Sequence, residues 1–181
     1  MKKIIILLIA IISITGCTLS DIDNTPTKQV EAFFNNYQTL DKKVLDDLDL
    51  VINKKTNYNE QQKEEYRKIL KKHYQNLTYE IKDETVNGDR ANVEVEIEVT
   101  DFYKTLKEAK DYLENHQEDF IDETGNYSES KYIDYQLDKL NDTKDTVKYT
   151  LNLTLNKVDN NWQLEQIDEI EEKKILGIYE Y

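Results

Sequence analysis

The sequence predicts an α+β domain in which N-terminal helices pack on a four-stranded antiparallel sheet, with further helices between the two pairs of strands. Three observations lead to this fold class. Apolar residues repeat at helical spacing over residues 26–76. They then alternate with polar residues in two separate stretches, residues 77–99 and 147–166. Helical spacing returns between these stretches, over residues 103–142.

Three helices are expected before the first strand. The first begins at Pro26, which suits a first helical position, with Thr25 as its cap. The second covers residues 41–52, and the third begins at Asn59, where Gln62 completes a capping box. Each helix carries one apolar stripe. The stripes are Val30, Phe33, Phe34 and Tyr37; Val44, Leu45, Leu48, Val51 and Ile52; and Tyr66, Ile69, Leu70, His73 and Tyr74.

The first pair of strands is joined by Asn87-Gly88-Asp89, a turn sequence that suits positive φ. Before this turn, residues 77–81 alternate between apolar and polar. After it, residues 91–99 form the clearest strand of the chain. Its alternating residues are apolar Val93, Val95, Ile97 and Val99 and acidic Glu94, Glu96 and Glu98. We expect the apolar side to be buried and the glutamate side solvated, with this strand as the central register of the sheet.

A helical excursion is expected between the two hairpins. It consists of one helix over residues 103–120, a loop over residues 125–130 and a second helix over residues 131–140. Strand alternation resumes over residues 147–155, and Asp159-Asn160-Asn161 turns the chain into a last strand. In that strand Trp162, Leu164 and Gln166 share one face. Residues 171–181 either extend it or form a short terminal helix.

The first seventeen residues predict where the chain is located. Lys2 and Lys3 precede an almost unbroken apolar run over residues 4–14, and small residues lead into Cys17, the single cysteine. This is the pattern of a secretory signal, and the run is too short for a ~30 Å hydrocarbon core, which takes about 20 apolar residues. The ending Ile-Thr-Gly-Cys resembles the lipobox of bacterial lipoproteins. That resemblance implies a signal peptide over residues 1–16, cleavage between Gly16 and Cys17, and a diacylglycerol on the Cys17 thiol.

A lipid on Cys17 implies a domain anchored to the cell membrane on its extracytoplasmic face, with residues 17–25 as the tether. Removal of Lys2 and Lys3 with the signal leaves 22 basic side chains against 37 acidic ones, a net charge of −15. This charge disfavours nucleic acid as a partner, because phosphate backbones are bound by Lys and Arg. It also disfavours direct adhesion to anionic lipid. With one cysteine, the chain forms no intramolecular disulfide.

The order of elements and four sequence segments resemble the nuclear-transport-factor-like, or cystatin-like, superfamily. Within it, the chain is similar to small cell-envelope lipoproteins of Gram-positive bacteria. The segments are TPTKQVEAFF from Thr25, LTYEI from Leu77, ANVEVEI from Ala91 and KVDNNWQL from Lys157. The resemblance implies one domain over residues 26–181, in which a curved sheet wraps around the helices as a cone with a pocket. Residues 103–142 are then a helical insertion, long for the family, that could cap or fill the pocket. The fold hosts both enzymes and binding modules.

An enzyme of this superfamily places its acid and base on the inner face of the sheet, and alternation leaves that face almost entirely apolar. Tyr149 is its polar-tipped exception. Gln166 and Asp168 share a face with Trp162 at the end of the last strand. Asp168 and Tyr149 are therefore the carboxylate–hydroxyl pair that could converge on a pocket, with Asp168 as a base. The competing interpretation places Asp168 at a frayed, solvated strand end.

Neither a metal nor a cofactor is predicted. His73 and His116 lie on separate predicted helices, and His73 is expected at a helix edge. Asp46, Asp47 and Asp49 lack the glycine and the terminal glutamate of a calcium loop, so they indicate a solvated helix face.

Three functions remain open. The first is a non-enzymatic binding or accessory lipoprotein, which binds an envelope protein or a small apolar ligand. The second is a small isomerase- or dehydratase-like enzyme that uses Asp168 and Tyr149. The third is a structural module whose excursion helices dock an envelope protein, with Tyr127, Tyr132 and Tyr135 as an exposed recognition patch. The near-absence of polar groups on the inner face places the enzyme below the other two, and the first is the leading expectation.

Overall fold

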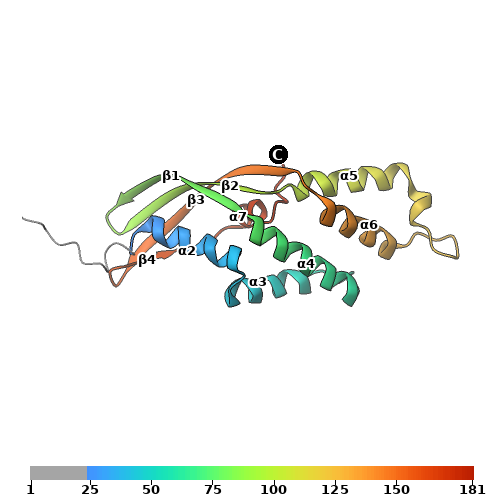
Figure 1. Cartoon of the computed structure of the whole chain (residues 1–181), viewed down its shortest axis with the longest axis horizontal. Helices are drawn as coiled ribbons and strands as arrows, with labels where there is room; N and C mark the ends of the chain where they lie inside the picture. Colours follow the sequence, from blue (N-terminus) through green and yellow to red (C-terminus); the bar gives the residue numbers. More distant parts are fainter. Residues whose placement is uncertain (1–23) are drawn as a thin grey trace, which may run out of the picture.

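The computed structural model describes residues 24–181, which form an α+β fold with helices on one face of an open, four-stranded antiparallel sheet (Figure 1). The predicted fold class is confirmed. The expected signal peptide, the cleavage point at Gly16 and Cys17, and most of the tether lie outside the described residues. Asn24 is hydrogen-bonded to the turn between the last two strands. Its side-chain amide donates a hydrogen bond to the Asn160 carbonyl oxygen at 2.6 Å and accepts one from the Trp162 N–H at 3.1 Å.

The helices before the sheet are α2 (Pro26–Thr39), α3 (Lys42–Asn53) and α4 (Glu60–Asn76). Each begins after a side chain that accepts a backbone N–H of the first turn. These caps are Thr25, Asp41 and Asn59. Gln62 completes the predicted capping box on α4. The three predicted helices are therefore confirmed; the stripes of α2 and α4 pack on the sheet, and that of α3 packs on these two helices.

The sheet has the order β1 (Thr78–Asn87), β2 (Arg90–Thr100), β3 (Thr146–Val158) and β4 (Asn161–Leu164). Strand β2 pairs with β1 on one side and β3 on the other, so that Val95 lies opposite both Ile81 and Leu151. The apolar side of β2 is fully buried, whereas its three glutamates stay partly exposed. The predicted central register is confirmed.

Both hairpin turns use the positive φ angles that their sequences predict. Gly88 has φ 62° in the two-residue connection between β1 and β2. Asp159 and Asn160 have φ 49° and 63° between β3 and β4, the pattern of a type I′ turn. These turns match the right-handed twist of the strands that they join.

The helical excursion consists of α5 (Phe102–Asn115), the short 3₁₀ helix η1 (Gln117–Phe120) and α6 (Glu129–Asp142). Helices α5 and α6 form a hairpin that extends beyond the end of the sheet (Figure 1). The extents of both helices differ from the prediction. His116, at φ −141° and ψ 49°, interrupts the first helix. The second helix begins at Glu129, after its cap Ser128, and ends at Asp142, so it is two residues longer than predicted at each end.

The last strand is shorter than its alternation predicts. Strand β4 ends at Leu164, and Asp168 is the N-cap of helix α7 (Glu169–Ile175). The Asp168 carboxylate accepts the Glu171 N–H at 2.8 Å, and the Glu171 carboxylate accepts the Asp168 N–H at 3.4 Å. This capping box favours helix over strand. The expectation that Gln166 and Asp168 share a strand face with Trp162 is therefore wrong.

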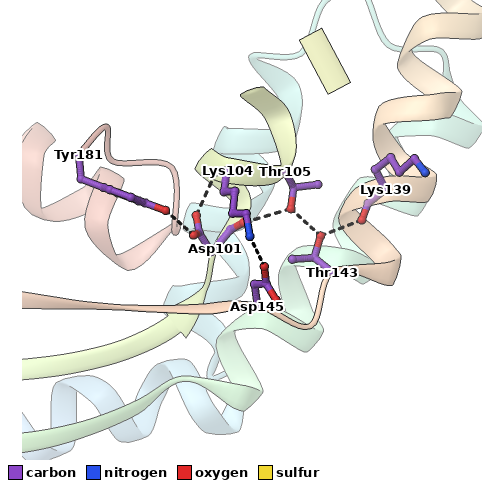
Figure 2. A network of polar contacts seen from close by, with 7 residues as sticks. All are labelled: Asp101, Lys104, Thr105, Lys139, Thr143, Asp145 and Tyr181. Atoms are coloured by element: carbon purple, nitrogen blue, oxygen red, sulfur yellow. Dashed lines mark hydrogen bonds and ion pairs between the residues drawn. The ribbon is translucent and has the colours of Figure 1, made fainter. Parts of the chain in front are cut away.

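The sheet, the helical hairpin and the C-terminal residues meet at Asp101 (Figure 2). The Asp101 side chain is buried, accepts the Lys104 N–H at the start of α5 and accepts the Tyr181 hydroxyl at 2.6 Å. Lys104 pairs with Asp145 at 2.5 Å, just before β3. The Thr105 and Thr143 hydroxyl groups form a hydrogen bond of 2.8 Å, which joins α5 to the end of α6. The hairpin is thus fixed to the sheet by polar contacts at its base.

Candidate functional site

A groove of ≈760 Å³ lies between helices α2, α3 and α4 on one side and the segment from β4 to α7 on the other. Its volume is in the range of small-ligand sites, about 300–1,000 Å³. Much of its lining is apolar or aromatic, including Phe33, Tyr37, Leu50, Val51, Tyr74 and Ile167. Leu50 is 61% exposed at this surface. The groove can therefore take an apolar group of a ligand.

Three aromatic rings line the groove from α2 and α4. Phe33 and Tyr37 are four residues apart, which places them on one face of α2. Their ring centroids are 5.2 Å apart, and Tyr37 meets Tyr74 of α4 edge to face at 5.0 Å. Edge-to-face contact between rings holds them in a fixed arrangement.

Two exposed acidic residues also line the groove, Asp47 from α3 and Glu172 from α7. Burial, with the charges of Asp47 and Glu172, raises the pKa of Tyr37 to about 12. Burial, with Tyr37, Tyr66 and the same two carboxylates, raises the pKa of Tyr74 as well. Both hydroxyls therefore stay protonated at neutral pH beside two negative charges. In residues 24–181, neither Asp47 nor Glu172 forms an ion pair.

Four other charged residues line the groove. Asp41 caps α3 through the Val44 N–H at 2.9 Å, and Glu165 lies 3.8 Å from Arg90, so both carboxylates have partners. Lys43 and Lys54 are exposed near the two ends of α3. Lys43 is four residues before Asp47 and therefore on the same side of the helix. It is the cation that can compete with a ligand for Asp47.

The structure separates the three residues predicted for a pocket. Gln166 is exposed and lines the groove. Asp168 is exposed and caps α7. Tyr149 is buried on β3 and donates its hydroxyl to the Tyr179 carbonyl oxygen at 3.0 Å. Asp168 and Tyr149 thus each have a structural partner of their own, and of the three predicted residues Gln166 borders the groove.

The three tyrosines predicted as a recognition patch lie on the helical hairpin but differ in exposure. Tyr127 is 53% exposed, whereas Tyr132 and Tyr135 are half-buried. Both half-buried rings contact Phe120 edge to face, each at 5.4 Å. The exposed part of the expected patch is therefore narrower than predicted, because two of its rings hold the hairpin together.

His73 is fully buried, so its expected place at a helix edge is wrong. Its Nε2 lies 2.8 Å from the Ile175 carbonyl oxygen, and its ring stacks on Phe102 with centroids 4.7 Å apart. Nδ1 has no hydrogen-bond partner among the described residues. Burial lowers the pKa of His73 to about 4, although its bond to Ile175 acts in the opposite direction. His73 is a neutral side chain of the core.

The expected solvated aspartates of α3 include two exposed ion-pair partners, because Asp46 pairs with Lys42 and Asp49 with Arg67. Across residues 24–181, no cluster of three or more His, Cys, Asp or Glu side chains is placed to hold a metal ion.

Tyr74 is in the core as its stripe predicts, but the groove was missed in the sequence because Phe33 and Tyr37 were assigned to the core as well and are only partly buried. Periodicity shows that a stripe is apolar, but it does not show how much of the stripe another element covers. Asp47 also looks like any solvated residue of α3 until α7 is placed opposite it. The local sequence signal for the groove was the pair of aromatic residues Phe33 and Tyr37, which are four residues apart on α2.

No family model matches the chain, and no curated protein or solved structure is significantly similar to it. Within the part of the chain that the structure describes, no helix combines the length and apolar character needed to cross a membrane.

Proposed function

We propose that this chain is a lipid-anchored, extracytoplasmic binding protein whose groove holds a ligand with an apolar body. The groove between α2, α3, α4 and α7 carries the proposal, because it is large enough for a small ligand and part of its apolar lining is accessible, with Phe33 and Val51 half-buried and Leu50 exposed. The ligand would bury part of its apolar surface against Phe33, Leu50 and Val51. Burial of such surface contributes about 25 cal/mol per Å².

The lipid anchor is supported by the Ile-Thr-Gly-Cys ending after an apolar run. Cys17 and Asn24 are seven residues apart, at most about 25 Å of chain. Since Asn24 is hydrogen-bonded to the turn between β3 and β4, a lipid on Cys17 would hold that end of the domain toward the membrane. The α5–α6 hairpin is at the other end of the molecule and would point away from the membrane (Figure 1).

Binding is favoured over the enzymatic alternative by the placement of Asp168 and Tyr149. A general base has to lie within hydrogen-bond reach of the proton that it abstracts. The Asp168 carboxylate accepts a hydrogen bond from the Glu171 N–H at the start of α7, and the Tyr149 hydroxyl donates one to the Tyr179 carbonyl oxygen. Turnover of a carbonyl or lactone substrate that is lost in Asp168→Asn would support the enzyme instead.

The binding role can be tested with 3-phenyl-1-propanol, a neutral probe with an apolar ring. The full chain, held in lipid nanodiscs, is dialysed against the probe, and empty nanodiscs give the partition into lipid. Ala32→Trp fills the groove and should abolish specific binding. Asn35→Trp is the matched control, because Asn35 is exposed on the same helix and does not line the groove. Equal binding by both variants would refute the groove as the binding site.

The anchor has a separate test. The mass of the protein isolated from bacterial membranes should show a mature chain that begins at lipidated Cys17. Cys17→Ala should remain unprocessed and lack the lipid. A wild-type protein with an intact Met1, or with a bare Cys17 thiol, would contradict the anchor while leaving the groove untouched.

A further inference from the structure

The chemistry of the groove distinguishes among apolar ligands. Its aromatic rings lie on α2 and α4. Asp47 on α3 and Glu172 on α7 line it as well, and among the described residues neither carboxylate has an ion pair, nor the capping hydrogen bond that Asp41 has. A negative charge beside the rim of an apolar site costs desolvation energy when a neutral ligand covers it. A cationic ligand removes that cost, because it supplies the missing counter-charge.

We infer that the ligand of the groove is a small organic ammonium ion with an apolar body, bound between the Phe33 and Tyr37 rings and the carboxylates of Asp47 and Glu172. This inference rests on the proposed function and adds the charge of the ligand. An ammonium group is attracted to the face of an aromatic ring by the ring quadrupole. Carboxylates beside the rings add a direct charge–charge attraction.

The arrangement of the aromatic rings supports the ammonium assignment. Tyr74 is buried and packs edge to face on Tyr37 at 89°, so it fixes the Tyr37 ring, while half-buried Phe33 and Tyr37 present ring surface to the groove. Phe33 adds a third ring next to Tyr37, at an interplanar angle of 66°. Sites of several rings set at such angles are suited to alkylated ammonium groups, which present a diffuse charge without strong hydrogen-bond donors.

The size of the groove favours a small molecule over a protein segment. A volume of ≈760 Å³ lies within the range of about 300–1,000 Å³ that is typical of small-ligand sites. The overall charge favours a cation as well, because the whole chain carries 37 acidic and 24 basic side chains. Long-range attraction would raise the local concentration of cations near the groove.

Lys43 can compete with a cationic ligand for the Asp47 carboxylate, and its substitution therefore tests the inferred charge of the ligand. It is four residues before Asp47 on α3, so its ammonium group can reach toward the same carboxylate that the ligand uses. Lys43→Gln should therefore strengthen binding of a cationic ligand, because it removes the competing charge. Lys42→Gln is the matched control, since Lys42 pairs with Asp46 and does not line the groove.

The experiment uses three probes with one apolar body: (3-phenylpropyl)trimethylammonium, 3-phenyl-1-propanol and 4-phenylbutanoate. Each is dialysed against the full chain in nanodiscs, with empty nanodiscs as the reference. We expect the cation to bind at least about tenfold more tightly than the alcohol, and the carboxylate to bind least. Asp47→Asn/Glu172→Gln should reduce binding of the cation to the level of the alcohol and leave the alcohol unchanged.

The matched control is Asp46→Asn/Glu169→Gln, which makes the same charge change on the same two helices at residues outside the groove. It should leave the preference for the cation intact. A preference lost equally in this control would reduce the effect to surface charge and overturn the inference.

The remaining outcomes separate the two proposals. If the alcohol and the cation bind equally and Ala32→Trp abolishes both, the groove is a binding site but the inferred ammonium ligand is wrong. Tightest binding of 4-phenylbutanoate also overturns the inference. If none of the three probes binds, the proposed function fails as well.

Discussion

The Tyr149 hydroxyl donates a hydrogen bond to the Tyr179 carbonyl oxygen at 3.0 Å, and the two rings meet edge to face with centroids 5.8 Å apart. Tyr149 lies on the buried face of β3, and Tyr179 follows α7. Burial, and then the charge of Asp101, raises the pKa of Tyr149 to about 12, so its hydroxyl remains a donor at neutral pH. The Tyr149 hydroxyl, on the inner face of the sheet, thus holds the C-terminal residues in place.

Tyr149→Phe should lower the free energy of unfolding by about 1 kcal/mol, because it removes one hydrogen bond and leaves a carbonyl group without its donor. Urea denaturation followed by the fluorescence of Trp162, the single tryptophan, measures this change. Binding of 3-phenyl-1-propanol should stay at the wild-type level. A loss of binding at unchanged stability would show that Tyr149 acts on the ligand instead.

Gly177 should tolerate no side chain. Its φ is +68°, and an added Cβ would overlap the Thr100 carbonyl oxygen and lie 3.2 Å from Cε1 of His73. We expect Gly177→Ala to cost about 3 kcal/mol or more, because both the backbone and the close approach oppose it.

Gly125→Ala is the control for this prediction. Gly125 also has a positive φ, +84°, but an added Cβ meets nothing within 4 Å. Its substitution should cost only the conformational strain, about 1–2 kcal/mol. Equal losses in the two variants, measured in the same denaturation assay, would show that the contact with Thr100 contributes nothing.

Elements governed by local patterns were predicted well. The Val/Glu alternation of β2 leaves one possible register, because a shift of one residue would bury Glu94, Glu96 and Glu98. The cap at Asn59 and the turn at Gly88 depend on neighbouring residues alone. Such features are visible in sequence because their energetics are decided within a few residues.

Features that depend on distant contacts were not predicted. The start of α7 is a local exception, because Gln166 and Asp168 continue the strand pattern but the capping box of Asp168 and Glu171, which lies within four residues, starts a helix there. His73 looked like a helix-edge residue, and its burial depends on Phe102 and Ile175, which come from other elements. The groove requires α7 to stand opposite α3. No periodicity within one segment contains that information.

The two sides of β2 should respond very differently to substitution. Val95 is fully buried, so Val95→Asp places a carboxylate in the apolar core and should unfold the domain. Glu96 is partly exposed beside Lys148 and Lys82, so Glu96→Gln should change the unfolding free energy by less than about 0.5 kcal/mol. Comparable losses in chemical denaturation would contradict the observed register.

His73 should make the domain less stable in mild acid. The pKa of His73 is about 4 in the folded protein, against an ordinary value of 6.5. The unfolded chain therefore binds a proton that the folded protein refuses, and stability falls as the pH drops from about 6.5 to about 4. The loss from this group reaches at most about 3 kcal/mol at the lower end.

His73→Leu should remove this component, because leucine has no titrating group. The variant loses the bond to Ile175 and is expected to be less stable at pH 7. The informative quantity is the slope of unfolding free energy against pH between 6.5 and 4, which should be flatter than in the wild type. Parallel curves would assign the acid sensitivity to other groups.

The tyrosines of the helical hairpin should separate into one exposed and one structural position. Tyr135 stacks on Tyr112 at 5.0 Å and packs against buried Phe120 at 5.4 Å, so Tyr135→Ala should cost about 2 kcal/mol and lower the melting temperature. Tyr127 is 53% exposed, and Tyr127→Ala should change stability by less than about 0.5 kcal/mol. Thermal unfolding of both variants checks this. If Tyr127→Ala destabilises as much as Tyr135→Ala, packing around Phe120 does not hold the hairpin, and if neither does, the hairpin depends on its polar base at Asp101.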